Sequence, residues 1–152
     1  KYLICGQGDL QEHLTNKARE LNVNVKFLGF REDILEISAI TDLFVFPSRQ
    51  EGLPVALMEA MAAGLPVICS KIRGNIDLIE DGKGGYLVDP NDSDGFADAI
   101  MRLYKNFDKS LNMGFYKVRS VNKFDSSKVM YKMNQVYNEI EDTNKNERTA
   151  NK

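Results

Sequence analysis

The sequence predicts an α/β fold with a doubly wound parallel sheet, and two observations carry this prediction. Short apolar runs rich in Val, Ile and Phe alternate with amphipathic segments along most of the chain. Turns that contain glycine separate several of these runs from the segments that follow. Runs of this kind, joined through helices, are typical of parallel strands that helices cover on both faces.

The same alternation predicts the individual elements. We expect strands over 2–5, 25–28, 43–46, 67–69 and 85–88. We expect helices over 10–21, 34–39, 55–63, 76–79, 94–104, 109–121 and 126–140. Asp9 and Glu12 have the spacing of a capping box for the first helix, and Pro54 suits the first turn of the third helix. Residues 1–141 are thus predicted to form one domain, and the polar residues 142–152 to form a disordered tail.

The overall composition narrows the class of partner and the compartment. The 152-residue chain has 20 Lys and Arg and 22 Asp and Glu, which give a formal net charge of -2. No overall positive field therefore favours nucleic acid as a partner. No run approaches the roughly 20 apolar residues of a membrane span. We therefore expect a soluble, cytoplasmic protein, with the inner face of the membrane as an alternative location. Because the chain begins in a strand without a methionine, we expect it to be part of a longer protein.

The two cysteines are predicted to be reduced and buried. Cys5 and Cys69 each lie in a short apolar run that has the pattern of a buried strand. Such a position is usual for a core thiol in the cytosol. A disulfide between them is the less favoured alternative.

Two glutamates are the strongest candidates for chemistry. Glu59 lies on an apolar helix that offers it no basic partner one turn away, and a carboxylate there is costly unless another group donates to it. Glu51 lies in the loop before that helix. The helix begins near Pro54, about 7.5 Å along the axis from Glu59, so both carboxylates can reach one ligand at the helix N-terminus. Free amides and the helix dipole there favour binding of a phosphate. The two carboxylates can accept hydrogen bonds from hydroxyls, so the combination suits a nucleotide sugar. The alternative is that Glu59 faces water or a distant Lys or Arg.

The segment 46–68 resembles the signature of the retaining GT-B-fold glycosyltransferases of family 4. That signature places two glutamates, with seven residues between them, within a frame of Pro-Ser, Glu-Gly and Ala-x-Gly-x-Pro-Val. The matching residues here are Pro47-Ser48, Glu51-Gly52, Glu59 and Ala62-Ala63-Gly64-Leu65-Pro66-Val67. Similar matches occur at Gly6-Gln7-Gly8-Asp9-Leu10, Phe27-Leu28-Gly29-Phe30 and the turn 79–88. The resemblance covers about residues 1–140 and implies a Rossmann-like C-terminal GT-B domain.

The resemblance also implies roles for individual residues. Glu51 would contact the donor sugar, and is the catalytic candidate, while Glu59 would contact the ribose. The other residues expected to line the donor are Gly6, Gly8, Phe30, Arg31, Ser48, Gly52, Leu53, Pro54 and Val55. Many family members have glycine where this chain has Pro54, which donates no hydrogen bond. No cofactor and no metal are expected.

The implied activity is transfer of a hexosyl or N-acetylhexosaminyl unit from a nucleoside diphosphate sugar, most simply a UDP-sugar. The implied acceptor is a glycan or a lipid-linked glycan in bacterial capsule, O-antigen or exopolysaccharide synthesis. The implied partner is an N-terminal GT-B domain that this chain lacks, so the chain alone should be inactive. The alternatives are a non-catalytic module that binds nucleotide sugars, and a GT-B-fold epimerase or phosphorylase.

Other candidates have simpler interpretations. Asp92-Ser93-Asp94 looks like a metal-binding pair of aspartates, but its place before a helix favours helix capping. His13 has no Cys or His companions for a metal site. Arg31 and Arg49 could reach phosphate or simply face solvent. The Met, Tyr and Val stripe over 129–140 is predicted to pack into the core.

Overall fold

The structure is a computed structural model that describes residues 1–150, apart from the side chains of Phe107 and of residues 141–150. It divides into two compact units, Lys1–Ile40 and Thr41–Lys152, each described here by itself. The α/β class expected from the sequence is confirmed, because every strand pair in both units is parallel. The single domain expected over residues 1–141 stays a prediction.

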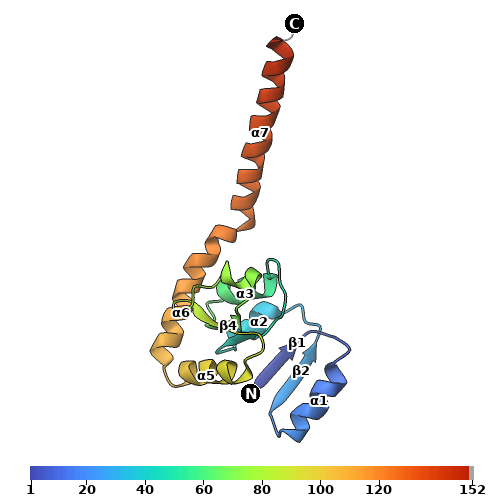
Figure 1. The fold of residues 1–152 in the computed structure, drawn as a ribbon, viewed down its shortest axis with the longest axis vertical. Helices are drawn as coiled ribbons and strands as arrows, with labels where there is room; N and C mark the ends of the chain where they lie inside the picture. Colours follow the sequence, from blue (N-terminus) through green and yellow to red (C-terminus); the bar gives the residue numbers. More distant parts are fainter. Residues whose placement is uncertain (151–152) are drawn as a thin grey trace. The chain divides into compact units, whose positions relative to one another are not determined.

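Unit 1 is a two-stranded parallel sheet with two helices (Figure 1). Its elements are β1 (Tyr2–Cys5), α1 (Gln11–Glu20), β2 (Val25–Gly29) and α2 (Ile34–Ala39). The register pairs Tyr2 with Val25 and shifts between Ile4 and Cys5. The capping box expected from Asp9 and Glu12 is absent, because α1 begins after Leu10, which as N-cap has no side-chain oxygen to offer.

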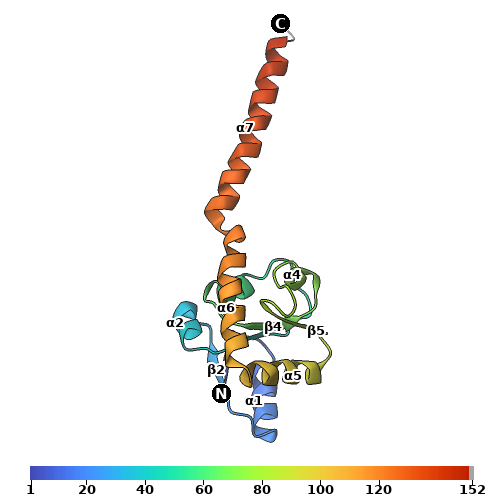
Figure 2. The same cartoon turned by 90° about the vertical axis from the view of Figure 1, so that its left-hand side faces the viewer.

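Unit 2 contains a three-stranded parallel sheet in the order β3-β4-β5. Its elements are β3 (Phe44–Phe46), α3 (Val55–Ala62), β4 (Val67–Ser70), α4 (Arg73–Ile76), β5 (Gly85–Val88), α5 (Ser93–Tyr104), α6 (Phe107–Val121), the 3-10 turn η1 (Asn122–Phe124) and α7 (Ser126–Ala150). Helix α5 packs against β4 and β5, and α6 packs against α5 and α3 (Figure 2). The sheet is therefore covered on both faces.

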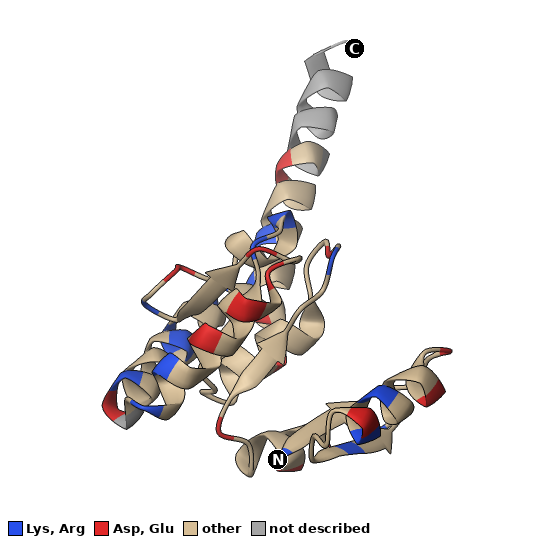
Figure 3. Cartoon of the chain, turned by 60° about the horizontal axis from the view of Figure 1, so that its bottom comes forward, with Lys and Arg blue, Asp and Glu red and all other residues tan. Residues whose placement is uncertain are grey.

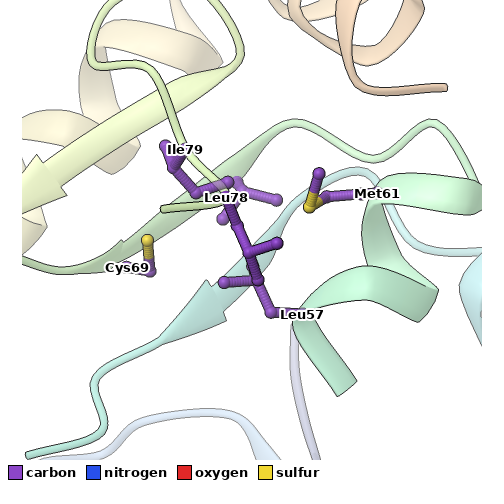
Figure 4. Packing of buried hydrophobic residues seen from close by; sticks show 6 residues of the cluster. Leu57, Met61, Cys69, Leu78 and Ile79 are labelled. Carbon is purple, nitrogen blue, oxygen red and sulfur yellow. The ribbon is translucent and has the colours of Figure 1, made fainter. Parts of the chain in front are cut away.

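Strand β4 divides the core of unit 2 into two clusters. Val67 and Cys69 join a cluster with Leu57 and Met61 of α3 and with Leu78 and Ile79 (Figure 4). Ile68 points to the other face, where it meets Val88, Ala99, Leu103 and Met113. All four residues of β4 are fully buried. Because neighbouring side chains of a strand point to opposite faces, this burial on both sides explains the uninterrupted apolar run that predicted the strand.

The helix between β4 and β5 lies earlier than the sequence predicts. We expected helix over 76–79, whereas α4 spans Arg73–Ile76. Leu78 and Ile79 are apolar because they fill the first core cluster and not because they form the face of a helix. The amides of both residues donate to the carbonyl of Asn75, which continues the turn without extending α4.

The C-terminal helix also differs from expectation. Its apolar stripe is exposed and does not pack into the core: Val129, Met133, Val136, Tyr137 and Ile140 are between 45% and 60% exposed. The backbone of α7 is helical to Ala150, past the expected end at residue 140. The tail expected over 142–152 falls where side chains are not described, and it stays a prediction.

The two cysteines lie in different surroundings. Cys69 is buried in β4, and burial raises the pKa of its thiol to about 12. Cys5 is exposed at the end of β1, so the prediction of burial is wrong for this residue, which ends an edge strand. Both thiols are free, as expected. Among the helices that the structure describes, none is long and apolar enough to cross a membrane.

Helix α6 carries a lysine into the core of unit 2. Lys117 is fully buried, and its Nζ donates to the carbonyl of Leu78 at 3.1 Å. Its side chain crosses Gly84, where a Cβ would lie 1.9 Å from the Cε of Lys117. Burial disfavours the ammonium and lowers its pKa from 10.5 to about 8.

This lowered pKa predicts a pH-dependent stability. Between pH 8 and 10.5 the unfolded chain binds more protons at Lys117 than the folded chain, so the free energy of unfolding should rise with pH in that window. We expect the rise to be roughly 1–3 kcal/mol larger in the parent than in Lys117→Met. Urea unfolding of both proteins from pH 7 to 10.5 measures the difference. Nearby Cys69, Glu80 and Lys123 are common to both, so parallel pH curves would contradict the assignment.

Candidate functional site

The loop between β3 and α3 presents an open helix N-terminus. Pro54 is the buried N-cap of α3, and its extended backbone (φ -74°, ψ 111°) turns the chain into the helix. No side chain caps this end. Met58 is the first residue whose amide bonds back within the helix, to the carbonyl of Pro54 at 3.2 Å. The amides of the first turn and the positive end of the helix dipole therefore remain able to bind an anion.

The two candidate carboxylates lie on either side of this helix end in the sequence. Glu51 is half-buried in the loop, and Glu59 is exposed on α3. Among the residues the structure describes, neither forms a salt bridge with Lys, Arg or His. Leu53 and Val55, also expected at the site, are 54% and 62% exposed. Both carboxylates are consequently accessible to a ligand. Their separate roles stay predictions.

In unit 1 the two glycine-containing loops lie side by side. The amide of Gly6 donates to the carbonyl of Gly29 at 2.7 Å, and Gly6 (φ +125°) and Gly29 (φ +67°) have backbone angles that favour glycine. Gly8 is exposed, and so is Phe30, at 69%. The loop before α3, which includes half-buried Ser48 and open Gly52, belongs to unit 2.

Arg31 is held by a neighbouring carboxylate. Its Nε donates to Asp33 Oδ1 at 2.7 Å, and its second nitrogen contacts Asp33 Oδ2, which makes a two-pronged ion pair. The guanidinium lowers the pKa of the Asp33 carboxyl. In order to bind a phosphate, Arg31 would have to divide its hydrogen bonds between the phosphate and Asp33. Arg49 is exposed in the loop of unit 2.

The aspartate pair before α5 is a helix cap, as the sequence predicts. Asp92 Oδ1 accepts from the amide of Gly95 at 2.8 Å. In the described part of the chain, no three His, Cys, Asp or Glu side chains are grouped so that they could hold a metal ion. Figure 3 shows acidic and basic positions on both units.

One element of the site was missed by the sequence reasoning. Helix α4 follows β4 and packs against the backbone of Glu51 and Gly52 through Gly74. Asn75 of α4 and Ser70 at the end of β4 are fully buried. Their atoms Asn75 Oδ1 and Ser70 Oγ have no hydrogen-bond partner in the described structure. The position of this segment in the sequence could have identified it, because it follows the carboxyl end of a parallel strand, as the candidate loops do.

An α/β fold with parallel strands, glycine turns and an open helix N-terminus is typical of domains that bind nucleotides. The family model for glycosyl transferases group 1 matches residues 1–118. The chain belongs to this family of glycosyltransferases.

Two curated relatives show how much of a longer protein this chain represents. It is 37% identical over 141 residues to an Escherichia coli UDP-Gal:alpha-D-GlcNAc-diphosphoundecaprenol alpha-1,3-galactosyltransferase, covering 90% of this chain and 36% of the relative. It is 31% identical to the N-acetyl-alpha-D-glucosaminyl L-malate synthase of Bacillus anthracis, covering 96% of this chain and 39% of that protein. The chain thus spans less than half the length of these relatives.

Solved structures show the same fold. The crystal structure of Anabaena HepE in complex with UDP matches with a TM-score of 0.85 and 26% identity, covering 90% of this chain and 40% of HepE. The pneumococcal O-GlcNAc transferase GtfA in complex with UDP and GlcNAc matches with a TM-score of 0.80 and 25% identity, covering 92% and 29% of the two chains. The neighbours are GT-B glycosyltransferases, which confirms the Rossmann-like C-terminal domain that the resemblance implied.

The cap at Asp92 yields a prediction that separates capping from metal binding. Asp92→Ala should lower the free energy of unfolding by about 1 kcal/mol, because the amide of Gly95 loses its acceptor. Asp92→Asn keeps a side-chain oxygen and should lose much less. Thermal unfolding with and without EDTA checks both variants. If EDTA lowers the stability of the parent protein to that of Asp92→Ala measured without EDTA, the capping role is contradicted.

Proposed function

We propose that this chain is the donor-binding part of a retaining glycosyltransferase. It would hold a nucleoside diphosphate sugar, with UDP as the nucleotide, while a hexosyl or N-acetylhexosaminyl unit moves to a glycan or lipid-linked acceptor. The observation that carries the proposal is the open N-terminus of α3, with an accessible carboxylate before it in the sequence (Glu51) and one within the helix (Glu59), in a chain of this family.

Several relatives support the choice of donor and acceptor. The name of the Escherichia coli relative contains a UDP-sugar and a diphosphoundecaprenol acceptor, and HepE and GtfA were both solved with UDP. A lipid-linked acceptor agrees with the proposed role in bacterial capsule, O-antigen or exopolysaccharide synthesis. It also agrees with a cytoplasmic location at the inner face of the membrane.

The chemistry of the site assigns different parts of the donor to different groups. The amides of Gly52, Leu53 and Val55 would bind the diphosphate and sugar, and Pro54 contributes no donor to this cradle. Glu59 would accept from ribose hydroxyls, while Glu51 would accept from hydroxyls of the sugar. The acceptor site and a basic clamp for the diphosphate would come from an N-terminal GT-B domain, so residues 1–152 alone should bind donor but transfer no sugar.

The two glutamates can be separated by ligand. A hydrogen bond to a charged group contributes roughly 1.5–3 kcal/mol, so Glu59→Gln should weaken UDP and UDP-sugar alike by about 10- to 150-fold. Glu51→Gln should leave UDP affinity nearly unchanged and weaken only the intact donor. Calorimetry with UDP, UDP-galactose and UDP-N-acetylglucosamine measures both effects.

Glu12→Gln is the matched control, because Glu12 is an exposed helical glutamate outside the proposed contacts. It should bind like the parent. The assigned roles are wrong if Glu59→Gln keeps the parent's UDP affinity, or if Glu51→Gln loses both ligands equally. Circular dichroism confirms that each variant is folded.

Donor binding should not depend on a divalent metal. The proposed site uses amides and the helix dipole to hold the diphosphate, which leaves no role for a bridging ion. The UDP affinity of the chain should therefore be the same in EDTA and in magnesium. A loss of binding in EDTA that magnesium restores would rule out the metal-free cradle.

A further inference from the structure

Helix α4 approaches the donor loop more closely than a side chain would allow. A Cβ placed on Gly74 would lie 2.6 Å from the carbonyl oxygen of Gly52 and 2.7 Å from that of Glu51. It would also lie 2.9 Å from the carbonyl carbon of Glu51. These are backbone atoms, so no change of side-chain rotamer relieves the overlap. Gly74 does not have a positive φ, so glycine is needed here for space and not for conformation.

Helix α4 is itself fixed to the core. The Nδ2 of Asn75 donates to the carbonyl of Ser70 at 2.8 Å, and Ser70 ends the fully buried strand β4. The carbonyl of Asn75 accepts from the amides of Leu78 and Ile79, two members of the first core cluster. Gly74 therefore lies on a turn that cannot easily move away from the loop.

The contact with Gly74 holds two peptide groups of the donor loop. The carbonyl oxygens of Glu51 and Gly52 lie on the side of the loop that faces Gly74. Because a peptide group is planar, holding its carbonyl also holds the plane of the N–H that follows it. On Gly52 the Cβ position is open, with no atom within 4 Å. The peptide groups that carry the amides of Gly52 and Leu53 are therefore packed against α4.

We propose that Gly74 is a positioning residue for the donor site. By admitting the carbonyls of Glu51 and Gly52, it fixes the peptide groups that carry the amides of Gly52 and Leu53 and holds Glu51 at the N-terminus of α3. This inference rests on the proposed function, because it assigns Gly74 to the same donor site. Gly74 itself does not touch the donor.

Gly74→Ala tests the inference. The added methyl must push the loop outward, so affinity for a UDP-sugar should fall by about tenfold or more, the loss expected for at least one charged hydrogen bond. Gly114→Ala is the matched control: its Cβ would lie 2.1 Å from the carbonyl oxygen of Gly64, a still tighter backbone contact at the other end of α3. It should lower stability without changing donor affinity in the folded protein.

A double-mutant cycle separates positioning from general destabilisation. If Gly74 acts through the loop that carries Glu51, the effects of Gly74→Ala and Glu51→Gln on UDP-sugar affinity should not add. The Gly114→Ala and Glu51→Gln effects should add. If Gly74→Ala does not fold, Asn75→Ala replaces it, because it removes the hold on Ser70 without adding bulk and should also weaken the donor.

The outcomes distinguish the two proposals. A parent chain that binds no UDP-sugar overturns the proposed function and this inference with it. A parent that binds, together with a folded Gly74→Ala that binds equally well, overturns the inference alone. Additive effects of Gly74→Ala and Glu51→Gln, or an equal loss in Gly114→Ala, would show that Gly74 supports the fold and does not position the loop.

Discussion

Burial of strand β4 on both faces is the constraint on which unit 2 depends. Its side chains enter two separate core clusters, one beneath α3 and one beneath α5 and α6. Losing either cluster would expose a face of the same strand, so both helical layers are tied to it. Helix α3 precedes β4 in the chain and α4 follows it. These two helices are therefore the most firmly placed parts of the proposed site.

The functional consequence is a donor loop whose backbone is held from one side. The carbonyls of Glu51 and Gly52 lie against Gly74 of α4, which holds the peptide groups that carry the amides of Gly52 and Leu53. Amides held in place before a ligand arrives need no reorganisation to bind a diphosphate, which lowers the entropic cost of binding. A rigid backbone can in this way supply an anion site with few charged side chains. That agrees with the formal net charge of -2 of the chain.

The sequence could predict what depends on local pattern. The run Gly85–Val88 and the cap at Asp92 were predicted correctly, because apolar periodicity and capping chemistry act over a few residues. Helix α4 was predicted too late in the sequence, because the apolar side chains of Leu78 and Ile79 fill a core that only the tertiary fold defines. The contact of Gly74 with the loop was missed for the same reason. The stripe over 129–140 shows the limit of periodicity, which identifies an apolar face but not what covers it.

The proposed function depends above all on the amides at the N-terminus of α3, which would bind the diphosphate of the donor. The most direct measurement is a titration of the isotope-labelled chain with UDP, followed through the amide resonances of each residue. If these amides bind the diphosphate, the largest shifts should occur at Gly52, Leu53 and Val55, while the amides of α5 stay unchanged. Saturating UDP that shifts other amides and leaves these three in place would contradict it.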